Sequence, residues 1–198
     1  MKKKLQRRLV IITGVPGTGK TAIATLLAKK MKAKLIALND LVSEFGLYTA
    51  VDEKDGAKIV RMGALENVAN EAIELELEKK DVVVEGHLAC ELDLGGKAVG
   101  DVKRIALVCR VHPDELKKRL AKRKYPKEKL GENTMAEMLD YCTVWAEKKY
   151  GRKHVLELDT TKKTAAKSAE EALALVLGKK KAGPRVDWGE ALFASVSP

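Results

Sequence analysis

The chain has 198 residues, of which 45% are hydrophobic and 33% are charged, and its formal net charge is +10. A chain of this length can bury a core large enough for one globular domain without a structural metal or disulfide. Its apolar runs, such as those at 9–12 and 82–84, are far too short to cross a bilayer, which excludes a membrane-spanning protein. Cys90, Cys109 and Cys142 lack metal-ligand spacing, which predicts reduced thiols and a cytoplasmic location.

The positive charge is concentrated at the two ends of the chain. Residues 1–8 contain five basic side chains and no acid, and residues 179–198 contain four basic and two acidic side chains. The body between these ends is nearly neutral for its size. Two interpretations of the ends stay open: they are solvated, frayed tails, or they attract RNA electrostatically.

Apolar strands alternate with amphipathic helices along the whole chain. In order, the pattern predicts a strand at 9–13, a helix at 20–31, a strand at 34–38, a mixed segment at 39–63, a helix at 64–80, strands at 81–85 and 104–109, helices at 114–123 and 132–150, a strand at 155–158, and a helix at 164–177. A tail begins near Gly178. Strands separated by helices in this order predict an α/β fold with a parallel sheet covered on both faces.

The strongest motif lies between the first strand and the first helix. It reads Gly14-Val15-Pro16-Gly17-Thr18-Gly19-Lys20-Thr21 and satisfies the phosphate-binding pattern G-x-x-x-x-G-K-[ST] in full. Glycines allow a tight turn that brings backbone N–H groups near phosphate oxygens, and the following helix adds its positive dipole end. The loop residues Gly14, Pro16, Gly17, Thr18 and Gly19 are therefore candidate ATP contacts. Lys20 is expected to contact the β and γ phosphates, and the hydroxyl of Thr21 to ligate Mg²⁺.

Ligands of open α/β sheets bind beyond the carboxyl ends of the strands, so the other segments at that edge are candidates too. These are Asn39-Asp40, Glu85-Gly86-His87, Arg110 and 159–162. Glu85 ends an apolar strand, where a carboxylate can hold Mg²⁺ or its water, and His87 is a candidate for orienting a water or acceptor. The alternative is that Glu85 is an ordinary strand-ending acid and His87 an incidental surface residue.

Two arginines follow the fourth strand on one predicted helix. Arg119 and Arg123 are four residues apart, so they share a helix face and can stabilise the charge of a transferring phosphoryl group. The polar segment 123–133 after them is a candidate lid that excludes water from ATP. The alternative is a solvated basic face, because several lysines surround both arginines.

Taken together, these motifs resemble the adenylate kinase isoenzyme 6 family, particularly its archaeal members, over about residues 8–178. The segments that carry the resemblance are 12–21, 39–48, 85–87, 119–125 and 129–137. The resemblance implies a three-layer P-loop NTPase fold with a five-stranded parallel sheet in residues 1–178. Within it lie a nucleoside monophosphate (NMP) segment at about 37–60 and a short lid at about 122–132. Residues 179–198 form a basic C-terminal tail outside the resemblance.

The resemblance also implies roles for individual residues. It adds Ala22, Arg123 and Lys162 to the ATP contacts of the phosphate loop. Glu85 stands where the family has an aspartate, which places this carboxylate at Mg²⁺ directly or through water.

The function that the resemblance implies is an ATP-dependent kinase that converts ATP and AMP, or another NMP, into two diphosphates, with additional ATPase activity. Family members also act in maturation of the small ribosomal subunit, which implies a platform ribosomal protein and ribosomal RNA as partners. Two alternatives stay open: a nucleotide-gated ribosome assembly ATPase with little metabolic role, and a small-molecule kinase for another acceptor, such as a sugar hydroxyl.

Overall fold

A computed structural model describes residues 6–52, 56–95 and 102–196. Its centre is a five-stranded sheet in the order β2-β5-β1-β6-β7, and every neighbouring pair is parallel. The strands are Arg8–Thr13 (β1), Lys34–Ala37 (β2), Val82–Glu85 (β5), Lys103–Arg110 (β6) and Val155–Asp159 (β7). Unbroken apolar runs suit strands that are buried on both faces. The predicted α/β fold with a parallel sheet of five strands is confirmed.

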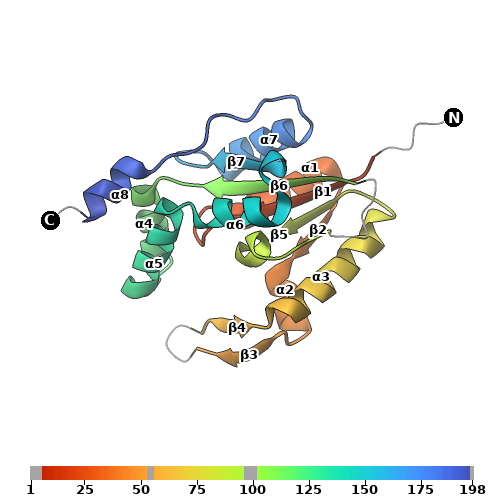
Figure 1. Ribbon diagram of the computed structural model, residues 1–198, viewed down its shortest axis with the longest axis horizontal. Coiled ribbons are helices and arrows are strands. Elements are labelled where there is room, and N and C mark those ends of the chain that lie inside the picture. Colours follow the sequence, from red (N-terminus) through yellow and green to blue (C-terminus); the bar gives the residue numbers. More distant parts are fainter. Residues whose placement is uncertain (1–5, 53–55, 96–101, 197–198) are drawn as a thin grey trace.

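Helices cover both faces of this sheet and complete the three layers (Figure 1). Lys20–Met31 (α1) and Ala165–Val176 (α7) pack together on one face, over apolar side chains of β1, β5 and β6. The opposite face is covered by Met62–Leu77 (α3), the short 3₁₀ helix His87–Cys90 (η1) and Tyr141–Tyr150 (α6). No helix in the described ranges is both long enough and apolar enough to cross a membrane.

The mixed segment after β2 folds into a short helix and a two-stranded hairpin. The helix is Leu38–Glu44 (α2), and Tyr48–Val51 (β3) pairs antiparallel with Lys58–Val60 (β4). Figure 1 shows the hairpin projecting away from the central sheet. The expected NMP segment, about 37–60, coincides with α2 and this hairpin, except that residues 53–55 lie outside the described part.

A second projection follows β6 and consists of two helices joined by a short turn. Pro113–Lys122 (α4) and Lys127–Met138 (α5) form this pair, with residues 123–126 at its tip. The pair is called the lid hairpin because it contains the expected lid at about 122–132, whose role as a lid stays a prediction. The prediction of one helix over 132–150 is wrong, because α5 ends at Met138 and α6 starts at Tyr141. Between them Asp140 has a left-handed backbone, with φ of 54°, and this conformation ends one helix and redirects the chain into the next.

The two ends of the chain differ in what the structure describes. Residues 1–5 of the basic N-terminal stretch lie outside the described part. The expected basic tail contains a helix, Gly189–Val196 (α8), which lies beside the lid hairpin in Figure 1. α8 packs against α5, and the short 3₁₀ helix Arg152–His154 (η2) precedes β7.

Candidate active site

The phosphate loop connects the buried end of β1 to the first turn of α1. Gly14 and Gly17 have φ values of 142° and 94°. A Cβ atom on Gly14 would lie 2.5 Å from the carbonyl oxygen of Cys109, and one on Gly17 would lie 2.7 Å from Leu116. Both the backbone conformation and the lack of space therefore require glycine at these two positions. The loop is held against β6 and α4 with its backbone turned as phosphate binding requires.

Lys20 is the first residue of α1 and is partly buried by the loop. Its Nζ donates a hydrogen bond of 3.5 Å to the carbonyl oxygen of Val15. Burial lowers the pKa of Lys20, and the carboxylate of Glu85 opposes this effect. An ammonium group with little water around it gains strongly from an arriving phosphate, so Lys20 is well placed to stabilise anionic oxygens.

Thr21 and Glu85 meet next to the loop, although they are far apart in the sequence. The hydroxyl of Thr21 donates a hydrogen bond of 3.2 Å to Oε2 of Glu85, the last residue of β5. Mg²⁺ takes oxygen ligands and is usually held by one or two carboxylates together with substrate phosphates. This oxygen pair fits Mg²⁺. Water and the phosphate oxygens of a substrate would complete the coordination.

His87 lies two residues beyond Glu85, at the start of η1. Its Nδ1 is 3.2 Å from the carbonyl oxygen of Gly14. The carbonyl oxygen of His87 accepts a hydrogen bond of 2.9 Å from the hydroxyl of Thr13. Burial lowers the pKa of His87, and the charge of Lys20 adds to this effect, so the imidazole is neutral at pH 7. Because a carbonyl faces Nδ1, that nitrogen carries the proton and Nε2 is the acceptor.

Arg119 connects α4 to the phosphate loop and to the end of β7. Its Nη2 donates to the carbonyl oxygen of Thr160 at 3.1 Å, and its Nε donates to Glu115 at 3.1 Å. The hydroxyl of Thr160 in turn donates to the carbonyl oxygen of Thr18 at 3.0 Å. Arg123 stands one turn further along, at the exposed C-terminal end of α4. Arg119 does not belong to a purely solvated face, because it has buried partners. Arg123 is exposed and lines two hollows, so its role at the site stays a prediction.

The first hollow lies on the α1 and α7 side of the phosphate loop and has a volume of about 430 Å³. It is lined by Gly17, Thr18, Gly19, Ile23, Arg119, Lys122, Arg123, Thr160, Lys163, Ala165 and Ser168. Ser168 is 1% exposed, and its hydroxyl has no hydrogen-bond partner among the described residues. Buried hydroxyls nearly always have a partner, so this one is suited to a bound polar group.

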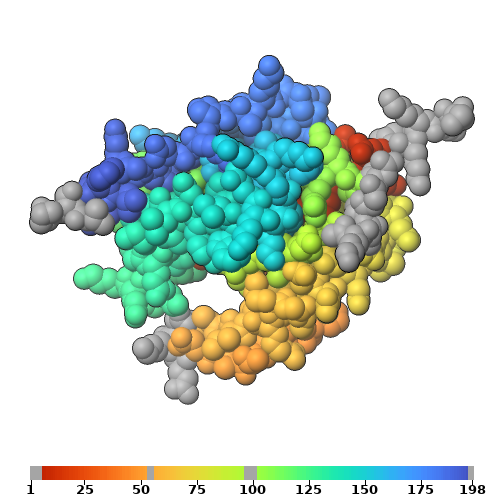
Figure 2. All heavy atoms as spheres, in the orientation of Figure 1, coloured from red at the N-terminus to blue at the C-terminus, as the bar shows by residue number. Residues whose placement is uncertain are grey.

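The second hollow lies on the opposite side of the loop and has a volume of about 630 Å³. It is lined by Pro16, Ala57, His87, Arg123, Lys124, Tyr125, Pro126, Lys129, Glu132 and Asn133. Figure 2 shows the surface hollowed between the β3–β4 hairpin (orange) and the lid hairpin (green). Three of its lining residues are basic and one is acidic, so the hollow favours an anionic ligand.

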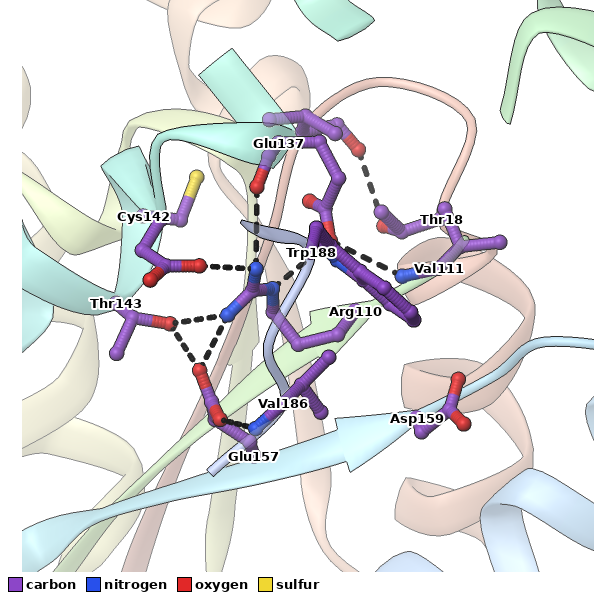
Figure 3. Close-up of polar contacts among 12 residues, drawn as sticks. Thr18, Arg110, Val111, Glu137, Cys142, Thr143, Glu157, Asp159, Val186 and Trp188 are labelled. Atoms are coloured by element: carbon purple, nitrogen blue, oxygen red, sulfur yellow. Dashed lines mark hydrogen bonds and ion pairs between the residues drawn. The ribbon is translucent and has the colours of Figure 1, made fainter. Parts of the chain in front are cut away.

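Arg110, which the strand pattern offers as a site candidate, has a different role. It is 1% exposed and lies at the centre of the group in Figure 3. Its Nε donates to Glu137 at 2.8 Å, its Nη1 donates to Glu157 at 2.5 Å, and its Nη2 pairs with Asp140. Burial opposes its charge, but these carboxylates prevail and raise the pKa of Arg110. This Arg110 cluster (Arg110, Glu137, Asp140, Thr143 and Glu157) joins β6 and β7 to α5 and α6.

The candidate residues therefore separate into those that meet at the loop and those that do not. Lys20, Thr21, Glu85 and His87 surround the loop, whereas Ala22 is exposed on the first turn of α1. Lys162 is exposed in the loop after β7, and its neighbour Lys163 is the lysine that lines the first hollow. Thr160 lies in the candidate segment 159–162, whereas Lys163 and Ser168 are residues that the sequence analysis does not predict. Their only sequence signal is their position next to, or in, the first turn of the helix that follows this segment.

Comparison with known proteins finds relatives and similar folds over most of the chain. The family model described as "AAA domain" matches residues 10–140. The chain is 40% identical over 169 residues to a protein of Methanosarcina acetivorans named "Putative adenylate kinase", covering 81% of this chain and 82% of that one. Among solved structures, a gluconokinase from Sinorhizobium meliloti has a TM-score of 0.56 at 15% identity and covers 98% of this chain and 100% of its own. A thymidylate kinase from Candida albicans has a TM-score of 0.56 at 14% identity, with coverages of 89% and 94%.

Proposed function

The chain belongs to the archaeal adenylate kinase family, and from this premise we propose that it is an ATP-dependent nucleoside monophosphate kinase with AMP as its acceptor. The reaction is ATP + AMP ⇌ 2 ADP. The observation that supports it best is the pair of hollows on either side of the phosphate loop, with Arg123 lining both. A phosphoryl group can pass directly between two nucleotides only if both bind against the same loop.

In this proposal the first hollow holds ATP. The loop backbone and Lys20 hold its phosphates, and the base lies towards Ser168 on α7. A buried hydroxyl left without a partner costs about 1–3 kcal/mol, so a hydrogen bond from the base to Ser168 would favour binding. Mg²⁺, held by Thr21, Glu85 and phosphate oxygens, supplies charge neutralisation when it is bound.

The second hollow holds the monophosphate. Arg123, Lys124 and Lys129 give it positive charge, which a neutral sugar does not need. An oxygen of the AMP phosphate attacks the γ-phosphorus, and the bond from that phosphorus to the bridging oxygen breaks. Arg123 contacts the transferring group from the lid side, while Lys20 follows it from the loop. Neutral His87 can accept a hydrogen bond at Nε2 from a water, and that water can donate its other hydrogen to the AMP phosphate and so orient the acceptor.

The experiment that tests this function is ADP formation with Mg²⁺ and ATP across AMP, CMP, GMP and UMP, with gluconate and shikimate as alternative acceptors. We expect ADP formation to depend on a monophosphate, AMP most strongly. The Lys20→Ala variant is the control, and we expect it to lower the rate by about a hundredfold or more. ADP release at one rate with every acceptor and with none would contradict the proposal, and selective response to a sugar or shikimate would favour the small-molecule kinase.

ATPase activity and contact with pre-ribosomal RNA or a ribosomal protein are further parts of the proposal. They are supported by the family resemblance and by the basic ends of the chain. RNA affinity would depend on the basic side chains of residues 1–8 and 179–185. Because Arg8, Lys180 and Arg185 form ion pairs within the fold, the test replaces Lys2, Lys3, Lys4, Lys179 and Lys181 by serine, which should flatten the decrease of log K with log salt. Fluorescence anisotropy with a ribosomal RNA fragment measures that slope. Equal slopes for the original chain and this variant would contradict a role of these lysines in RNA binding.

A further inference from the structure

The C-terminal segment, residues 185–196, returns to the carboxyl end of the sheet and contacts the Arg110 cluster (Figure 3). The backbone N–H of Val186 donates to Oε2 of Glu157 at 2.7 Å. The indole Nε1–H of Trp188 donates to Oε1 of Glu137 at 3.0 Å. Arg185 forms ion pairs with Glu147 and Glu157. Three residues of the segment therefore supply donors to carboxylates.

The charges of the Arg110 cluster explain why such donors are needed. One guanidinium faces the three carboxylates of Glu137, Asp140 and Glu157. The side chains of Glu137 and Glu157 are 2% and 4% exposed, so water can solvate little of the excess negative charge. A buried charge without sufficient hydrogen bonds is strongly destabilising. The C-terminal segment completes the hydrogen bonding of this site and is held there by the same interactions.

Trp188 also contacts an aromatic ring outside the Arg110 cluster. Its ring meets the imidazole of His112 edge-on, with ring centroids 5.1 Å apart and an interplanar angle of 77°. His112 is the N-cap of α4 and accepts a hydrogen bond of 3.3 Å from the backbone N–H of Asp114. Glu137 belongs to the last turn of α5. Trp188 thus contacts both ends of the lid hairpin that are attached to the sheet, the N-cap of α4 and the last turn of α5, which we call the roots of the lid hairpin.

The position of these roots decides where the tip of the lid hairpin lies. α4 and α5 leave the sheet edge together and meet at residues 123–126, and Arg123 at this tip lines both hollows. A rigid helix pair turns a small change of angle at its base into a larger movement at its tip. Fixing the spacing of His112 and Glu137 therefore limits how far Arg123 can move from the bound nucleotides.

We propose that Trp188 is a positioning residue for nucleotide binding: it clamps the roots of the lid hairpin and thereby keeps Arg123 at both hollows. This proposal depends on the proposed function in one respect, namely that ATP and AMP are the nucleotides that bind in the two hollows. It follows that residues 185–196 set nucleotide affinity without touching a nucleotide.

Three variants test the clamp. Trp188→Phe keeps an aromatic ring but removes the N–H, and Trp188→Ala removes both contacts. Ser195→Ala is the matched control, because its hydroxyl donates only within α8, to the carbonyl oxygen of Leu192. The measurements are the Kd for a non-hydrolysable ATP analogue by calorimetry, KM and kcat for ATP and AMP, and the thermal unfolding midpoint.

We expect Trp188→Ala to raise the Kd and both KM values by about tenfold, which corresponds to the loss of one hydrogen bond to a charged group. It should also lower kcat, because Arg123 contacts the transferring phosphoryl group. Trp188→Phe should give an intermediate effect, and Ser195→Ala none. A lower unfolding midpoint with unchanged Kd and KM would show that Trp188 only stabilises the fold and would overturn the proposal. Analogue binding does not depend on the acceptor, so failure of AMP to react would refute the kinase assignment without affecting this test.

Discussion

Replacing Arg110 by methionine is the sharpest test of the Arg110 cluster. The substitution preserves much of the side-chain length but leaves the buried carboxylates of Glu137 and Glu157 without their cation. Removing one partner of a buried ion pair typically costs about 3–5 kcal/mol. For a chain of 198 residues, about 2–4 °C of unfolding midpoint is lost per kcal/mol, so the decrease should be roughly 6–20 °C.

The destabilisation caused by Arg110→Met should also depend on pH. Burial raises the pKa of Glu137, so the folded chain binds a proton at this carboxyl more readily than the unfolded chain does. A group of this kind favours the folded state at low pH and loses that contribution as the pH rises. Without the guanidinium of Arg110, protonation of Glu137 in the folded state becomes still more favourable. The difference in unfolding free energy between wild type and variant should therefore decrease as the pH falls from 7 towards 5.

Thermal unfolding followed by circular dichroism at pH 7 and pH 5 measures the decrease of the unfolding midpoint, and urea unfolding at the same two pH values measures the difference in unfolding free energy. Arg8→Met is the matched control, because Arg8 pairs with Asp81 at 3.2 Å but both side chains are partly solvated. Pairs of that kind contribute about 0–1 kcal/mol. If Arg110→Met and Arg8→Met destabilised the protein equally at pH 7, the inference that the cluster holds an excess of buried negative charge would be refuted.

Four further predictions concern the site. Arg123→Lys should lower kcat/KM for ATP by about tenfold or more, because a point charge cannot replace a planar fork; unchanged kinetics would return Arg123 to a solvated basic face. Glu85→Gln should raise the Mg²⁺ concentration needed for half-maximal rate, which a magnesium titration measures. Because burial lowers the pKa of His87, the acid limb of kcat/KM should lie below pH 6.5, and His87→Ala should remove that limb while ATP binding persists. Ser168→Ala should raise KM for ATP several-fold and leave KM for AMP unchanged; equal changes for both would exclude the base contact.

The sequence predicted well those parts of the molecule that are continuous in the chain. The phosphate loop, the strand before it and the helix after it occupy neighbouring residues, so the pattern between Gly14 and Thr21 specifies both conformation and chemistry. The sheet followed because each strand is an apolar run buried on both faces. The contact between Thr21 and Glu85 also followed from a general rule, since parallel strands bring their carboxyl ends to one edge.

Features that depend on distant partners were not predictable in this way. The helical pattern over 132–150 has no break, but Asp140 leaves the helix and pairs with Arg110, 30 residues earlier in the chain. Arg110 meets Glu137 and Glu157 across separations of 27 and 47 residues, and no local pattern indicates such a group. Trp188 was visible only as an aromatic residue within a polar tail. Its partners become evident once α5 and β6 are placed in space.

Neighbouring strands have different roles at the carboxyl edge of the sheet. β1 and β5 end at the phosphate loop, Glu85 and His87, which are the residues proposed to bind phosphate and Mg²⁺ and to orient the acceptor. β6 and β7 end in the Arg110 cluster, which is linked to the first hollow by Thr160, whose hydroxyl donates to the carbonyl oxygen of Arg110 at 2.9 Å. Substitutions at the first pair of strand ends should therefore change turnover, whereas those at the second should change the position of the lid hairpin. A kinase needs both, because water with access to bound ATP would hydrolyse its γ-phosphate.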